Sequence, residues 1–282
     1  MKDNRVLLGF SGGIDSFAAV GLLQTAGYHV TALTLDMKGD SALLEKARLR
    51  AGALGIPWRM QSVRERFERE VVDYFTDSYF RGRTPAPCTR CNSRIKWPCL
   101  AAEADALGIR YIATGHYFRI TSAGGKRYVT RAADNRKDQS YYLWDLPQEI
   151  LDRVLTPMGT VIKRNIVEEL ADRRESMGVC FLEGRPCRDF LRSRDKTEAL
   201  RPGPIIDSAG HRLGTHDGAA LYTIGQKKGL DLPPGWAVVA IDTAANRIVA
   251  GEEKLLLHRT LEVGECLSLI HISEPTRLAL IS

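Results

Sequence analysis

Short apolar runs alternate with amphipathic segments through the first part of the chain. The runs have the length of buried strands, whereas the segments between them repeat apolar residues at helical spacing. Strands are expected at 6–10, 30–35, 57–60 and 111–114, and helices around 17–23 and at 42–54, 63–80 and 95–107. Strands joined through helices form right-handed crossovers, so this order predicts a parallel sheet covered on both faces. The sequence therefore predicts an α/β domain over residues 1–186.

The composition of the sequence and the length of its apolar runs change after Pro186. Glycine, proline and aspartate become dense and the apolar runs become short, which is typical of a β-rich fold. A small β-rich central domain is expected over 187–234. An alternating segment from Trp236, a turn at 244–246 and a second strand from Arg247 then predict a hairpin. This hairpin opens a further β domain over 235–282, which we expect to be incomplete.

Composition limits the class of protein. The chain has 282 residues, of which 44% are hydrophobic, so it is long enough to bury a core. Its 40 Lys and Arg exceed its 34 Asp and Glu by six, a balance that suits a polyanionic partner without requiring one. No charged leader precedes an apolar run, and no run approaches the roughly 20 residues of a membrane helix. A cytoplasmic protein without a membrane segment is expected.

Six cysteines in such a chain argue against a disulfide scaffold and for thiol chemistry, metal binding or core packing. Cys88 and Cys91 form a Cys-x-x-Cys pair on a proline-stiffened loop, 82–92, a spacing that suits a redox pair or two ligands of one metal. Half of a zinc site is an alternative, although no second Cys-x-x-Cys follows and the nearest histidine is His116. Cys180 is flanked by apolar residues and fits a core thiol equally well.

A glycine-rich loop, 9–16, lies between the first expected strand and the first expected helix. Backbone N–H groups and a helix N-terminus converge at such a position and attract phosphate. The loop lacks the Gly-Lys-Ser/Thr of a Walker A motif and the spacing of dinucleotide folds. Its Ser-Gly-Gly-x-Asp-Ser sequence instead resembles the PP-loop of ATP pyrophosphatases, which hold the pyrophosphate of ATP while AMP is transferred to a substrate oxygen. The alternative is a turn that merely joins a strand to a helix.

Several motifs in the same order carry a closer resemblance. They are the loop 9–16, the Cys88/Cys91 pair, Cys180 and the segments 113–117, 137–142, 202–205 and 222–230. From about Val6 to about Val263 the chain resembles the bacterial and organellar tRNA 2-thiouridylases usually called MnmA. The resemblance implies a PP-loop domain of the adenine nucleotide alpha hydrolase type, a β-rich central domain and a C-terminal β-barrel.

The resemblance also implies roles for individual residues. ATP, accompanied by Mg²⁺, would be held by Gly9, Phe10, Ser11, Gly12, Gly13, Ile14, Asp15, Ser16, Leu35 and Gly115. The target base would face Ala86, Pro87 and Cys88. The tRNA anticodon stem-loop would contact His116, Lys137, Asp138 and Gln139. Asp15, Cys91 and Cys180 would be catalytic, with Cys180 carrying the transferable sulfur and Cys91 acting as its partner thiol.

The implied reaction is 2-thiolation of the wobble uridine, in which ATP adenylates the C2 oxygen and sulfur then replaces it. A persulfide on Cys180 delivers the sulfur in one version, and Cys91 breaks the remaining S–S bond. In the other version Cys88, Cys91 and Cys180 bind a [4Fe-4S] cluster. Cys88 favours the cluster, because many family members carry Asp there. A monomer served by a sulfur-carrier protein or a cysteine desulfurase relay is expected.

The chain also departs from the family in length. The segment 166–176 is shorter than usual, and the tail from about residue 267 no longer resembles the family. We therefore expect a truncated C-terminal barrel with an atypical tail.

Two other functions stay open. One is a PP-loop ligase or amidotransferase that adenylates a small metabolite and needs no cysteine. The other is a paralogue that binds tRNA without catalysis.

Overall fold

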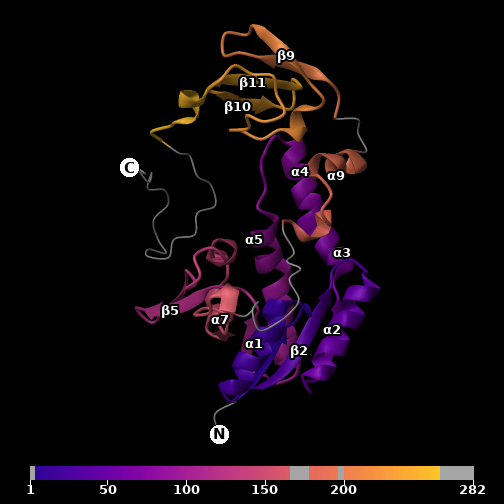
Figure 1. Ribbon diagram of the computed structural model, residues 1–282, viewed down its shortest axis with the longest axis vertical. Helices are drawn as coiled ribbons and strands as arrows, with labels where there is room; N and C mark the ends of the chain where they lie inside the picture. Colours follow the sequence, from indigo (N-terminus) through magenta and orange to yellow (C-terminus); the bar gives the residue numbers. More distant parts are fainter. Residues whose placement is uncertain (1–3, 166–177, 196–199, 261–282) are drawn as a thin grey trace. The chain divides into compact units, whose positions relative to one another are not determined.

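The computed structural model describes residues 4–165, 178–195 and 200–260, and these residues form two compact units (Figure 1). The first unit comprises Met1–Tyr74 and Ala86–Glu183, and the second comprises Phe75–Pro85 and Gly184–Ser282. The expected shortened segment 166–176, the expected tail from about residue 267 and Cys266 lie outside the described residues. The expected domain boundaries at 186 and 234 stay predictions.

A five-stranded parallel sheet forms the centre of the first unit. Its strands are β1 (Arg5–Gly9), β2 (His29–Asp36), β3 (Trp58–Ser62), β4 (Tyr111–Thr114) and β7 (Val154–Leu155), in the order β3-β2-β1-β4-β7. The predicted parallel α/β fold is confirmed. Strand order reverses between β1 and β4, and ligands of open parallel sheets bind at the carboxyl ends of the strands at such a switch point.

The central strand β1 is buried on both faces of the sheet. Val6 and Leu8 pack on one side against α1 (Ile14–Thr25) and α2 (Ser41–Ala53). Leu7 packs on the other side in a cluster with residues of α6 (Trp97–Ala106) and α7 (Gln148–Leu151). This two-sided cover explains why β1 reads as a continuous apolar run.

Two helical segments differ from their predicted forms. The helix expected at 63–80 is divided into α3 (Arg64–Phe67), the π-helical η1 (Glu68–Asp73) and α4 (Tyr74–Phe80). The helix expected at 95–107 begins earlier, with α5 (Pro87–Cys91) and the π-helical η2 (Asn92–Lys96) preceding α6. The Cys-x-x-Cys pair therefore lies on a helix, and the expectation of a loop over all of 82–92 is wrong. Pro87 stands in the first turn, where its missing N–H costs nothing.

Smaller elements complete the first unit. A hairpin of β5 (Arg119–Ala123) and β6 (Lys126–Thr130) follows β4, and the 3-10 turn η3 (Ser140–Leu143) follows the hairpin. The 3-10 turn η4 (Cys180–Leu182) carries Cys180.

The second unit contains a four-stranded sheet with the order β10-β11-β8-β9. Its strands are β8 (Gly203–Ile206), β9 (Arg212–His216), β10 (Trp236–Asp242) and β11 (Arg247–Glu252). The other elements are α9 (Cys187–Arg194), η5 (Ala219–Leu221) and η6 (Glu253–Leu256). The antiparallel pair β10/β11 is the hairpin expected from Trp236, and β8 pairs with β11 in parallel, so strands from both sides of residue 234 share one sheet.

No helix in the described part of the chain is long and apolar enough to cross a membrane.

Candidate active site

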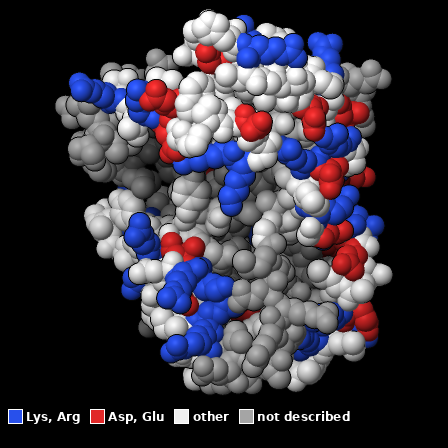
Figure 2. Space-filling model, turned by 45° about the horizontal axis from the view of Figure 1, so that its top comes forward, with Lys and Arg blue, Asp and Glu red and all other residues white. Residues whose placement is uncertain are grey.

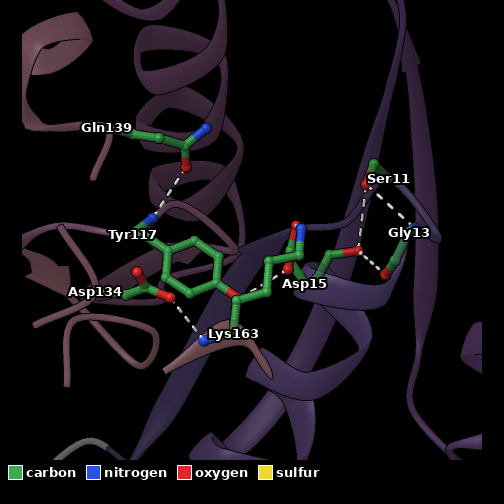
Figure 3. Close-up of polar contacts among 8 residues, drawn as sticks. Ser11, Gly13, Asp15, Tyr117, Asp134, Gln139 and Lys163 are labelled. Carbon is green, nitrogen blue, oxygen red and sulfur yellow. Dashed lines mark hydrogen bonds and ion pairs between the residues drawn. The ribbon is translucent and has the colours of Figure 1, made fainter. Parts of the chain in front are cut away.

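The glycine-rich loop closes on itself at the carboxyl end of β1. The Gly13 N–H donates to Ser11 Oγ at 3.3 Å, and Ser16 Oγ donates to the Gly13 carbonyl at 3.0 Å (Figure 3). Gly13 is the N-cap of α1, and no side chain caps this helix end. The first N–H groups of a helix have no partner within the helix. The loop therefore presents an uncapped helix N-terminus, which is suited to bind phosphate.

Two glycines allow the backbone to pack closely around this loop. A Cβ on Gly115, just after β4, would lie 2.8 Å from the Ser16 nitrogen in the first turn of α1. Gly12 has a φ of +69°, and a Cβ there would lie 2.9 Å from Cα of Ala47 in α2. Gly12 also accepts a hydrogen bond from Arg50 through its carbonyl at 2.5 Å. Space therefore requires glycine at both positions, and the positive φ requires it at Gly12 as well.

Asp15 is held by two side chains from distant parts of the chain. Tyr117 Oη donates to Asp15 Oδ1 at 2.8 Å, and Lys163 Nζ lies 3.1 Å from Asp15 Oδ2 (Figure 3). Lys163 is buried, and its backbone N–H donates to Asp134 Oδ2 at 3.0 Å. Sequence reasoning gave Lys163 no role, because no local motif marks it. Tyr117 stood within a family motif but had no role of its own.

His116 follows β4 and is only partly exposed. Its Nδ1 lies 2.8 Å from Thr114 Oγ1, and its ring stacks on Trp97 with centroids 6.5 Å apart. Burial and, to a smaller extent, the nearby Lys96 ammonium lower the pKa of His116 to about 3. The imidazole is therefore neutral at physiological pH. Its predicted contact with tRNA would have to be that of an uncharged ring.

Asp138 makes hydrogen bonds within its own loop, and Gln139 makes them with Tyr117, which lies just after β4. Gln139 Oε1 accepts from the Tyr117 N–H at 3.0 Å, and the Gln139 N–H donates to the Tyr117 carbonyl at 2.8 Å. Asp138 accepts from the Ala132 N–H at 2.8 Å and from Ser140 Oγ at 2.6 Å. These side chains fix the chain after β4. Their predicted tRNA contacts, and that of Lys137, stay predictions.

Cys88 and Cys91 lie on α5, one helical turn apart. Cys88 is partly exposed, whereas Cys91 is buried. Burial raises the pKa of Cys91 to about 11 and also raises that of Cys88, and Lys96 opposes both shifts. Cys180 also raises both pKa values by its own charge. The three thiols therefore lie within electrostatic range of one another.

Cys180 is exposed on η4 and is anchored at the carboxyl end of β2. Lys38, which follows β2, donates from Nζ to the Cys180 carbonyl at 3.3 Å and pairs with Glu183 at 2.8 Å. The adjacent Phe181 is buried and packs edge-to-face on Phe67, with centroids 6.1 Å apart. Cys180 thus stands at the same edge of the sheet as the glycine-rich loop.

The predicted cofactors fit this site unequally. The uncapped helix and its glycine cradle fit ATP phosphates, and Leu35, expected near the adenine, is partly buried on β2. Among the described residues, which include Cys88, Cys91 and Cys180, no group of three His, Cys, Asp or Glu is placed to hold a metal ion. Binding of a [4Fe-4S] cluster by Cys88, Cys91 and Cys180 stays a prediction. Of the residues expected to face the target base, Ala86 is the N-cap of α5, and Pro87, which directly precedes Cys88, is buried.

Charge on the surface is mixed. On the face drawn in Figure 2, the described Lys and Arg side chains are interspersed with Asp and Glu. On this face, no single patch of uniform positive charge marks where a polyanion would bind.

A substitution at Gly115 tests the close packing on α1. Gly115→Ala should destabilise the protein by about 1–3 kcal/mol, the usual cost of overpacking, because backbone atoms of α1 must shift. It should also weaken ATP binding. Gly21→Ala is the matched control, since Gly21 lies within α1 and a Cβ there meets nothing within 4 Å. The control should stabilise by about 0.5–1 kcal/mol. Chemical denaturation and nucleotide titration measure both effects, and equal behaviour of the two variants would contradict the packing.

The pKa of His116 predicts a pH dependence of stability. The pKa is lower in the folded state than the ordinary value of 6.5, so the stabilisation is complete above about pH 6.5 and is lost as the pH falls towards about 3. The loss should approach 1.4 kcal/mol per pH unit, at about one proton per molecule. His116→Gln should flatten this slope between about pH 6.5 and 5, whereas His29→Gln, at an exposed position on β2, should not. Denaturation at each pH measures the slope, and an unchanged slope in His116→Gln would refute the assignment.

The family models match most of the chain. Residues 4–184 match the model described as tRNA methyl transferase HUP domain, and residues 188–252 match the tRNA methyl transferase PRC-barrel domain.

Curated relatives agree along almost the full chain. A tRNA-specific 2-thiouridylase MnmA from Phocaeicola vulgatus is 40% identical over 290 residues, covering 98% of this chain and 81% of the relative. A protein of the same name from Moorella thermoacetica is 40% identical over 279 residues, covering 90% of this chain and 78% of the relative. One from Bacteroides fragilis is 40% identical over 278 residues, covering 90% and 76%. The chain therefore belongs to the MnmA family of tRNA-specific 2-thiouridylases.

Proposed function

We propose that this protein is an ATP-dependent tRNA-uridine 2-sulfurtransferase that acts on the wobble uridine of the anticodon. The observation that carries the proposal is that the phosphate-binding loop and Cys180 lie at the same edge of the sheet. The phosphate-binding loop follows β1, and the backbone of Cys180 is tied to Lys38 directly after the neighbouring β2. Parallel neighbours end at the same edge of a sheet, so activation by ATP and sulfur transfer are possible at one edge.

ATP makes the C2 oxygen of uridine a leaving group. The oxygen attacks the α-phosphorus, the bond to the β-phosphate oxygen breaks, and pyrophosphate leaves while AMP stays on the base. The N–H groups at the start of α1 would stabilise the departing pyrophosphate. Mg²⁺ carried by ATP would neutralise phosphate charge. Asp15 is the acidic residue of the loop 9–16 and would be the side chain there to bind this ion.

Lys163 extends the positive charge at this loop. Its ammonium lies 3.1 Å from Asp15 within the first turn of α1. A buried ammonium at that position is able to neutralise charge on the pyrophosphate as it leaves. Tyr117 holds the other carboxylate oxygen of Asp15 and so keeps the side chain turned towards Lys163.

The sulfur step proceeds through a persulfide. A sulfur-carrier protein or desulfurase relay would load the exposed Cys180, whose terminal sulfur attacks C2 and expels AMP. The base is then joined to Cys180 through an S–S bond. Attack of the Cys91 thiolate on Cys180 Sγ breaks that bond, releases 2-thiouridine and leaves a Cys91–Cys180 disulfide. An external thiol reductant must reduce this disulfide before the next turnover.

The exposure of Cys180 and the burial of Cys91 support the persulfide version. A persulfide relay needs one exposed sulfur and one partner thiol nearby. Cys180 is exposed, and its charge raises the pKa of the buried Cys91.

Cysteine variants test this function. Cys180→Ser and Cys91→Ser should abolish 2-thiouridine in tRNA, measured by mass spectrometry of wobble uridines after expression in a thiolation-deficient host. Both should keep tRNA-dependent pyrophosphate release, because the adenylation step uses no thiol. Cys187→Ser, at a partly exposed cysteine of the second unit, is the control and should retain thiolation.

Three results would separate the alternatives. Full activity of Cys180→Ser would favour a metabolite ligase, and ATP binding without tRNA-dependent pyrophosphate release would indicate a non-catalytic paralogue. Cys88→Asp should retain thiolation under the persulfide version. Loss of both iron absorbance and thiolation in Cys88→Asp, after anaerobic reconstitution, would establish the cluster version instead.

Replacement of Lys163 tests the adenylation step alone. Lys163→Met should lower the rate of pyrophosphate release by about 10- to 150-fold, as expected for loss of a hydrogen bond to a charged group. Lys163→Arg retains the charge and should lose less. Pyrophosphate release at saturating tRNA measures the effect. A normal rate in Lys163→Met would show that Lys163 only positions Asp15.

A further inference from the structure

Exposed aromatic side chains are concentrated in one short segment. Among the large apolar side chains that are exposed in the described part of the chain, all the aromatic ones lie between residues 141 and 144. Tyr141 is 70% exposed, Trp144 48% and Tyr142 37%. We call these three residues the aromatic patch. Tyrosine and tryptophan usually bury most of their rings, so a cluster left in water indicates a binding surface.

The backbone below the patch is fixed. Leu143, between the exposed rings, is buried, and Leu146 is buried one turn later. The Tyr142 N–H donates to the Gln139 carbonyl at 3.0 Å, and Gln139 is itself bonded twice to Tyr117. Tyr141 and Tyr142 pack edge-to-face with centroids 5.6 Å apart. The rings are thus presented by a rigid turn, and little conformational entropy is lost when a ligand binds to them.

The patch adjoins the helix that carries the two cysteines. Asn92, which directly follows Cys91, is buried and donates from Nδ2 to the Tyr142 carbonyl at 3.3 Å. The patch also begins directly after the segment 137–140, in which Lys137 is expected to contact tRNA. A ligand on the patch would therefore lie beside the place where the target base is sulfurated.

We propose that the aromatic patch is a stacking platform for unpaired bases next to the target uridine in the anticodon loop. The inference rests on the proposed function and adds to it the way in which the loop is held. A uridine turned out of its stack leaves its neighbours without a stacking partner. Tyrosine and tryptophan rings replace that partner for any base, so the platform holds the loop without reading its sequence.

The size of the patch favours RNA over a protein partner. A stable protein interface covers about 800 Å² on each partner, with an apolar core. The patch consists of three side chains of one turn, and the other exposed apolar residues, such as Leu49 on α2 and Met60 on β3, belong to other elements. A few aromatic rings that follow basic residues such as Arg136 closely in sequence are the composition of a site for single-stranded nucleic acid.

Binding of short RNAs tests the platform. Tyr141→Ala and Trp144→Ala should each weaken binding of an anticodon stem-loop RNA by about 5- to 150-fold, the range of one base–aromatic stack. Binding of the same stem as a fully paired duplex should not change. Trp144→Leu keeps an apolar side chain without a π face and should lose binding like alanine, whereas Trp144→Phe should retain most of it. Leu49→Ala removes an equally exposed apolar side chain on α2 and should have no effect.

The outcomes separate this inference from the proposed function. Wild-type protein that neither binds the stem-loop nor forms 2-thiouridine would contradict the proposed function itself. Wild-type protein that thiolates, with Tyr141→Ala and Trp144→Leu binding the stem-loop normally while remaining folded by circular dichroism, would overturn the platform alone. A change in sedimentation of these variants without a change in RNA binding would assign the patch to a second copy of the chain.

Discussion

The close approach of two backbones at the switch point of the sheet is the constraint on which the site depends. The chain leaving β4 at Gly115 passes so near the first turn of α1 that a single Cβ would meet the Ser16 nitrogen at 2.8 Å. This contact keeps the helix N-terminus and the carboxyl end of β4 together. Because His116 and Tyr117 follow Gly115 directly, the same contact brings Tyr117 to Asp15 and places His116 on Trp97. A single backbone contact therefore positions the glycine-rich loop together with Tyr117 and His116.

Burial gives the two implicated sulfurs different properties. Cys91 is buried and its pKa is raised to about 11, so it is predominantly a thiol at neutral pH and resists adventitious oxidation. Cys180 is exposed, which the proposed loading by a sulfur-carrier protein would require. Attack by Cys91 requires loss of its thiol proton, and the nearby Lys96 ammonium favours the thiolate. Exposure and burial thereby fit the order of steps in the proposed persulfide route.

Sequence reasoning found the elements that local pattern specifies. The strands β1, β2, β3 and β4 and the phosphate loop were predicted because apolar runs and glycines mark them directly. β7 was missed because two residues carry no periodic signal. Lys163 was missed because its ion pair with Asp15 spans 148 positions, and a lone lysine in the segment after Pro157 looks like any surface cation. Asp138 and Gln139 were assigned to RNA by resemblance, and that contact stays a prediction. No motif reveals the hydrogen bonds that Asp138 makes with Ala132 and Ser140 or those that Gln139 makes with Tyr117.

The π-helical turn after Cys91 explains how a cation reaches the cysteines. In a π-helix residues five apart are bonded, so η2 places Lys96 one wide turn beyond Cys91 and on the same side of the helix. An α-helical turn would bring Ile95 there instead, and Ile95 is buried in the core. Lys96 is only partly buried and makes no hydrogen bond or ion pair with a described residue. Its charge opposes the burial that raises the pKa values of Cys88 and Cys91, and it adds to the lowering of the His116 pKa. The irregular turn thus directs a positive charge at the thiols without a carboxylate to neutralise it. This charge would favour the Cys91 thiolate that the proposed persulfide route requires.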